Sequence, residues 1–121
     1  MVALVVDDSA AMRRAQQKIL EGLGWQVYVA SGGEQALSML AGLPDCDLLV
    51  TDWHMPGMDG IALIHAVRSD LRHRNLRILM VTSDSVLSTV QQALAAGAND
   101  VLMKPYTREA MAERLLEVMG G

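Results

Sequence analysis

The sequence predicts an α/β domain in which a doubly wound, five-stranded parallel sheet lies between two layers of helices. Short apolar runs at residues 3–6, 27–29, 48–50, 78–81 and 101–103 have the length of strands. Between them, apolar residues recur every three or four positions, as in amphipathic helices. The strand-like runs are apolar throughout, which is typical of parallel strands covered on both faces. With 121 residues and a hydrophobic fraction of 51%, we expect one domain spanning residues 1–121.

Five helices are predicted from apolar residues at helical spacing. These are Met12, Ala15, Ile19 and Leu23 in the first, residues 33–40 in the second, Ile61, Ile64, Val67 and Leu71 in the third, Val86, Val90 and Leu94 in the fourth, and Met111, Leu115 and Val118 in the last. Ser9 and Thr107 are residue types that cap helix N-termini. Glycine favours helix ends, so Gly22 or Gly24 should end the first helix and Gly97 the fourth.

Composition narrows the class of protein. No apolar run approaches the roughly 18 residues that a membrane helix needs, and no export signal precedes the first strand, so we expect a cytoplasmic protein without membrane insertion. The single Cys46 excludes an internal disulfide and a cysteine metal cluster. The net charge of −4 gives no general attraction to nucleic acids. The basic stretch Arg68, Arg72, His73, Arg74 and Arg77 is predicted to be solvated surface.

Polar residues of different chemistry follow the carboxyl ends of four predicted strands. They are Asp7, Asp8, Asp52, Thr82 and Lys104. In doubly wound sheets, ligands bind beyond these strand ends, because the connections there leave a crevice. The convergence of acids, a hydroxyl and an ammonium at one edge therefore predicts a functional site.

The acids predict a divalent metal. Asp7 and Asp8 alone would be read as strand-end or helix-capping acids, but Asp52 on a neighbouring strand changes that reading. Like charges placed so close repel each other unless a cation or protonation relieves the repulsion, and Mg²⁺ prefers oxygen ligands. Asp52 is either a further ligand or a nucleophile that accepts a phosphoryl group as an acyl phosphate. Thr82 and Lys104 suit phosphoryl oxygens.

The peptide bond between Lys104 and Pro105 could be cis or trans. A cis bond before Pro105 would aim the Lys104 amine at the acidic edge, whereas a trans proline would simply open the last helix. The sequence leaves both geometries open.

Five short motifs then point to one family. They are VVDDS (5–9), DWHMPGMDG (52–60), VTS (81–83), AGA (96–98) and KP (104–105). In this order and spacing they resemble the receiver domain of two-component response regulators, along the whole chain. The sequence around Asp52 and the lack of an output domain make the chain most similar to the CheY-like, chemotaxis-type, single-domain branch.

The resemblance implies strand order 2-1-3-4-5 and a phosphoacceptor. Asp52 would receive a phosphoryl group from the phosphohistidine of a sensor histidine kinase or a histidine phosphotransfer protein. Asp8, Asp52 and the backbone carbonyl of His54 would bind Mg²⁺ directly, and Asp7 largely through water. Thr82 and Lys104 would hold the phosphoryl oxygens.

The resemblance also implies a switch that controls a downstream effector protein. The new dianion would draw Thr82 inward and alter the face of the fourth helix, fifth strand and last helix. Ser83 matches the small residue that the family needs beside the phosphate. Val101 stands where many relatives carry an aromatic switching residue, and Tyr106 follows the proline at another familiar aromatic position.

His54 and Asp84 lie two residues beyond Asp52 and Thr82, where receivers tune the loss of the phosphoryl group. They would either orient the attacking water or obstruct it. Substitutions there should change dephosphorylation more than phosphorylation.

Other functions compatible with the sequence are a Mg²⁺-dependent phosphatase or phosphotransferase enzyme, a receiver domain cut from a longer regulator or hybrid kinase, and an interaction domain without the chemistry. Such an enzyme would need a general acid at the His54 position and a substrate-capping insertion, and the chain has no stretch long enough for one. We therefore expect the chain to promote only its own phosphorylation and dephosphorylation.

Overall fold

The computed structural model describes residues 1–84 and 86–120, so Gly121, the last residue of the predicted domain, lies outside the described part. The strands are β1 (Val2–Val6), β2 (Gln26–Ala30), β3 (Leu48–Asp52), β4 (Arg77–Thr82) and β5 (Asp100–Met103). The helices are α1 (Ala10–Gly22), α2 (Gly33–Ala41), α3 (Gly60–Arg68), α4 (Leu87–Ala96) and α5 (Arg108–Val118), with a short 3-10 helix, η1 (Leu71–His73). Every predicted strand is found, each one or two residues longer than predicted.

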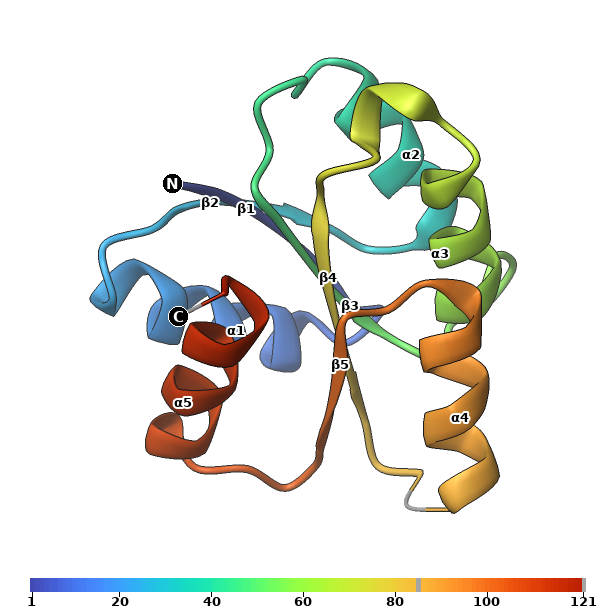
Figure 1. Ribbon diagram of the computed structural model, residues 1–121. Helices are drawn as coiled ribbons and strands as arrows, with labels where there is room; N and C mark the ends of the chain where they lie inside the picture. Colours follow the sequence, from blue (N-terminus) through green and yellow to red (C-terminus); the bar gives the residue numbers. More distant parts are fainter. Residues whose placement is uncertain (85, 121) are drawn as a thin grey trace.

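The sheet is parallel throughout, in the order β2-β1-β3-β4-β5, which confirms the predicted fold class and strand order. Helices α1 and α5 cover one face, and α2, α3 and α4 cover the other (Figure 1). Successive residues of a strand point to opposite faces. In β3, Leu49 packs into the core under α2, α3 and α4, whereas Leu48 and Val50 pack into the core under α1 and α5.

The predicted helix caps are confirmed. The Ser9 hydroxyl accepts a hydrogen bond from the Met12 amide at 3.3 Å, and the Thr107 hydroxyl accepts one from the Ala110 amide at 3.0 Å. Each cap satisfies an amide that the first turn of its helix leaves without a partner. Helix α4 ends before Gly97, whose φ of 123° lies in the left-handed region that favours glycine.

The buried faces of two helices differ from the predicted ones. Helix α1 buries Gln16 and Leu20, and Ala15 is exposed. Helix α4 buries Thr89, Ala93 and Ala96, while Val86 and Leu94 are 59% and 46% exposed. Periodicity favours the face with the largest apolar side chains, but α4 approaches the sheet through small side chains, which allow close packing.

The third helix is shorter than predicted. It ends at Arg68, and Leu71 begins the separate helix η1 with its side chain 78% exposed. The Asp70 carboxylate accepts a hydrogen bond from the Arg72 amide at 3.0 Å and so caps this new turn. A capping aspartate competes with continuation of the helix, which explains the break.

The prediction that the basic stretch is solvated is wrong for two of its members. His73 is buried, and the partly buried Arg68 side chain donates hydrogen bonds to the carbonyl oxygens of Gly97 and Leu76 at 2.9 and 2.6 Å. Arginine has a long apolar stem that can cross the packed layer and bring its charge to carbonyl groups. None of the helices in the described residues is long and apolar enough to cross a membrane.

Candidate functional site

Parallel register brings the acids together at the carboxyl edge of the sheet. Val6 of β1 pairs with Thr51 of β3, so Asp7 and Asp52, the next residue after each, lie side by side. Carboxylate oxygens of Asp7, Asp8 and Asp52 all lie within 4.8 Å of one another. The predicted convergence of three acids is therefore confirmed.

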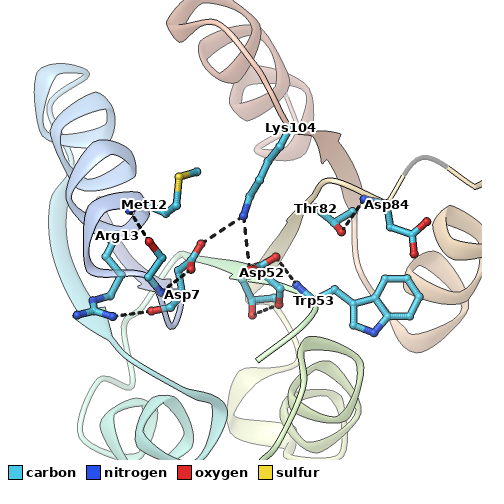
Figure 2. Close-up of polar contacts among 10 residues, drawn as sticks. Asp7, Met12, Arg13, Asp52, Trp53, Thr82, Asp84 and Lys104 are labelled. Carbon is cyan, nitrogen blue, oxygen red and sulfur yellow. Dashed lines mark hydrogen bonds and ion pairs between the residues drawn. The ribbon is translucent and has the colours of Figure 1, made fainter. Parts of the chain in front are cut away.

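Lys104 reaches into the acidic group from the end of β5. Its ammonium lies 3.5 Å from a carboxylate oxygen of Asp7 and 3.5 Å from one of Asp52, as Figure 2 shows. The Lys104 amide donates to the Thr82 carbonyl at 2.8 Å, and the Lys104-Pro105 bond is cis. The sequence left a cis and a trans bond open. The structure has the cis bond, with the Lys104 amine directed at the acids.

Asp7 is the most deeply buried acid of the site, with 1% of its surface exposed. Burial raises the pKa of its carboxyl, while the amide of Ser9, which donates at 2.9 Å, and the charge of Lys104 oppose that rise. Arg13 donates to the Asp7 carbonyl at 2.7 Å, a contact that sequence reasoning missed. Its position one helical turn after the Ser9 cap is the only signal in the sequence that could have indicated it.

The Asp52 carboxylate is oriented by the backbone amide of the next residue. The Trp53 amide donates to one carboxylate oxygen, Oδ1, at 2.8 Å, and the other, Oδ2, faces Lys104. The Gly60 amide donates to the Trp53 carbonyl at 2.7 Å, and a Cβ at Gly60 would collide with the Asp52 carbonyl oxygen. A glycine at the start of α3 therefore permits the tight turn that follows the acid.

Two predicted tuning residues meet above the edge of the sheet. Nε2 of the exposed His54 lies 3.8 Å from Oδ2 of Asp84, and the imidazole stacks on the Trp53 indole with ring centroids 5.2 Å apart. The Asp84 amide donates to the hydroxyl of the fully buried Thr82 at 3.2 Å. The His54–Asp84 pair thus links the loop after β3 to the loop after β4.

The remaining predicted residues occupy three environments. Ser83 is exposed at the carboxyl end of β4. Val101 is 6% exposed in the core under α2, α3 and α4, whereas Tyr106 is partly buried against the core under α1 and α5. Because these two side chains pack on opposite faces of the sheet, Tyr106 does not fill the place of the missing aromatic.

The donor set fits Mg²⁺. Three carboxylates face one lysine, so negative charge is in excess, and all the side-chain donors are the hard oxygens that Mg²⁺ prefers. The same edge carries a buried hydroxyl and an ammonium that suit a phosphoryl group. The edge can therefore hold a cation and an oxyanion side by side.

Known proteins are similar to this chain in sequence and in fold. The pattern of the response regulator receiver domain matches residues 3–116. The chain belongs to this receiver family. The receiver domain is 40% identical over 121 residues to chemotaxis protein CheY1 of Helicobacter pylori, covering 99% of this chain and 98% of that protein. It is 40% identical over 119 residues to chemotaxis protein CheY of Pseudomonas aeruginosa, covering 98% and 95% of the two chains.

A solved structure agrees with this receiver assignment. The chemotaxis protein CheY4 of Vibrio cholerae superposes with a TM-score of 0.90 at 32% identity, covering 97% of each chain. The receiver domain described here is therefore of the CheY type, in fold as well as in sequence. The family belongs to two-component signalling, and the named relatives are chemotaxis proteins.

Proposed function

We propose that this receiver domain is a Mg²⁺-dependent signalling switch in which Asp52 accepts a phosphoryl group from a phosphohistidine. The donor would be a sensor histidine kinase or a histidine phosphotransfer protein. The observation that carries the proposal is the cluster of three carboxylates, two of which lie 3.5 Å from the ammonium of Lys104. The negative charge at this edge is only partly neutralised by Lys104, and a bound cation would neutralise more of it.

Asp8, Asp52 and the backbone carbonyl of His54 would hold the ion, and Asp7 would act largely through water. A relative supports this role: a structure titled as the CheX–CheY–BeF3–Mg²⁺ complex of Borrelia burgdorferi has a TM-score of 0.92 at 26% identity, covering 100% of this chain and 90% of that one. Bound Mg²⁺ would neutralise charge on the carboxylates and the incoming phosphoryl oxygens.

The chemistry is a displacement at phosphorus. One Asp52 carboxylate oxygen attacks, forming an O–P bond, while the N–P bond to the donor imidazole breaks and its electron pair returns to the nitrogen. The Lys104 ammonium, 3.5 Å from Asp52, and the Thr82 hydroxyl would bind the transferred oxygens. Hydrolysis of the acyl phosphate resets the switch. His54 and Asp84, which flank the site, would set its rate.

The phosphorylated state would be read at the surface of α4, β5 and α5. When Thr82 turns toward the phosphoryl oxygens, its hydrogen bond from the Asp84 amide is lost, and the loop after β4 must move. Ser83 leaves access to the phosphate. Val101 is too small to follow the movement as an aromatic residue would, so the loop and the start of α4 would carry the signal to the effector protein. Pro105 and Tyr106 would keep the Lys104 turn in place.

Incubation of the purified protein with acetyl phosphate and Mg²⁺, followed by intact-mass measurement, tests the proposal. We expect a mass gain of one phosphoryl group, which is absent without Mg²⁺ and absent in Asp52→Asn. Asp59→Asn is the matched control, because Asp59 lies in the same loop and only caps α3 through a hydrogen bond from the Ala62 amide at 2.9 Å.

An unchanged mass in the wild-type protein, or the same gain in Asp52→Asn, would contradict the proposal. Rapid multiple turnover of the donor would favour a phosphatase instead. A cytoplasmic location and one receiver domain over all of residues 1–121 stay predictions from the sequence.

A further inference from the structure

The loop between β3 and α3, residues 53–59, supplies the His54 carbonyl and is fixed at both ends by its own residues. The Gly60 amide donates to the Trp53 carbonyl at 2.7 Å, and the Asp59 carboxylate caps α3. The middle of the loop is held from another element. The Met58 amide donates to Oε1 of Glu34 at 3.0 Å, across 24 residues of sequence.

Two glycines allow α2 and this loop to approach so closely. Gly57 has a φ of 75°, and a Cβ there would lie 3.0 Å from Oε1 of Glu34. A Cβ at Gly33, the first residue of α2, would lie 2.9 Å from the Met58 carbonyl oxygen. Side chains at these positions would push the loop away from the helix. The two glycines therefore allow the close approach that the hydrogen bond to Glu34 requires.

Glu34 is well placed to accept this hydrogen bond. It lies in the first turn of α2, where the helix dipole favours a carboxylate. In residues 1–84 and 86–120, no basic side chain forms a salt bridge with Glu34, so its carboxylate is available to the loop amide. A charged acceptor makes a stronger hydrogen bond to a backbone amide than a neutral one does.

We propose that Glu34 is a positioning residue for the Mg²⁺ site: by holding the Met58 amide, it fixes the loop that presents the His54 carbonyl. This role rests on the proposed function. Glu34 would not contact the ion, because it acts through the loop backbone. Loss of the hydrogen bond would let the middle of the loop fluctuate. The His54 carbonyl oxygen would then be held less precisely for the ion.

The test compares Glu34→Ala, which removes the acceptor, with Glu34→Gln, which removes the charge but keeps an acceptor oxygen. Glu109→Ala is the control, because Glu109 is likewise acidic in the first turn of its helix, α5. Nuclear magnetic resonance on labelled protein would give Mg²⁺ affinity from shifts of the Trp53 and His54 amides. Hydrogen exchange of the Met58 amide would be measured without metal.

We expect Glu34→Ala to weaken Mg²⁺ binding about three- to tenfold, the value of one hydrogen bond, and to speed exchange of the Met58 amide. In both Mg²⁺ affinity and Met58 exchange, Glu34→Gln should lie closer to the wild type than Glu34→Ala does. Glu109→Ala should match the wild type. The rate of phosphorylation at saturating Mg²⁺ should change little in all variants.

Equal weakening in Glu34→Ala and Glu34→Gln with unchanged Met58 exchange would indicate a through-space charge effect and would overturn the proposal. Normal Mg²⁺ binding in every variant would overturn the role of Glu34 alone. Absence of Mg²⁺ binding in the wild-type protein would overturn the proposed function itself, and this role with it.

Discussion

The two ends of the sheet handle buried charge in opposite ways. At the amino end, the Arg68 guanidinium lies against neutral oxygens: it donates to the carbonyls of Leu76 and Gly97 and to the side-chain oxygen of Asn99, at 2.6 to 2.9 Å. At the carboxyl end, three carboxylates lie together and the Lys104 ammonium contacts two of them, and burial raises the pKa of the Asp7 carboxyl.

The difference separates a partly buried charge whose polar partners lie within the fold from a group of acids with more negative than positive charge. Arg68 joins the end of α3 to the starts of β4 and β5, because the Asn99 oxygen also accepts from the Ile78 amide at 2.8 Å. Its polar partners are already in place, and burial, together with the like charge of nearby Arg77, lowers the pKa of its guanidinium. The acids at the other end lack sufficient positive charge, so binding a cation there gains free energy that folding alone does not provide.

The largest effect on stability should come from the amino end. Arg68→Met removes three hydrogen bonds and leaves the partly buried carbonyl oxygens of Leu76 and Gly97 without this donor, so we expect the free energy of unfolding to fall by about 3 kcal/mol. Urea unfolding followed by circular dichroism measures it. Arg74→Met is the control, since Arg74 is exposed, and it should change stability by less than about 0.5 kcal/mol. Equal effects of the two substitutions would remove the contrast between the two ends.

A smaller effect of opposite sign should come from the carboxyl end. Because the pKa of Asp7 is raised above its ordinary value of 3.8, the folded protein holds the proton more tightly than the unfolded chain does. The ionised carboxylate therefore destabilises the metal-free fold at neutral pH. We expect Asp7→Asn to stabilise the protein at pH 7 in the presence of a chelator.

That gain should fade as the pH falls through the raised pKa and vanish below 3.8, where the wild-type carboxyl is neutral in both states. Asp47→Asn is the matched control, because the Asp47 carboxylate at the amino end accepts a hydrogen bond from the Val2 amide at 2.8 Å. It should bring no gain. A destabilised Asp7→Asn would show that the acidic edge is compensated without a metal.

The smallest effect concerns the residues above the acidic edge. His54→Ala and Asp84→Asn should each change the rate of phosphoryl loss by several-fold, while phosphorylation by acetyl phosphate changes less. The reason is that both side chains lie beside the approach to Asp52 and are paired with each other at 3.8 Å. Time courses of intact mass after removal of the donor measure the loss. Equal changes in both steps would refute a tuning role.

The sequence predicted the sheet and its acidic edge well, because both follow from local signals. Apolar runs ending in Asp7 and Asp52 define strands, and parallel register then places those ends together whatever the helices do. The caps Ser9 and Thr107 were equally predictable, since a capping hydroxyl acts within three residues of its own position.

Contacts between distant segments could not be read in the same way. The hydrogen bond between Glu34 and Met58 and the contacts of Arg68 depend on how helices pack against loops, which no local pattern encodes. The buried face of α4 was mispredicted for a related reason. Its alanines give a weaker hydrophobic signal than Leu94, yet they allow the closer approach to the sheet.

The central claim is that the crowded acids at the carboxyl edge make Asp52 a phosphoacceptor. Borohydride reduction of protein treated with acetyl phosphate and Mg²⁺, followed by peptide mass mapping, tests it most directly, because an acyl phosphate of aspartate is reduced to homoserine. We predict homoserine at position 52 and aspartate at positions 7, 8 and 59. Homoserine at another of these positions, or none anywhere in the presence of Mg²⁺, would contradict the claim.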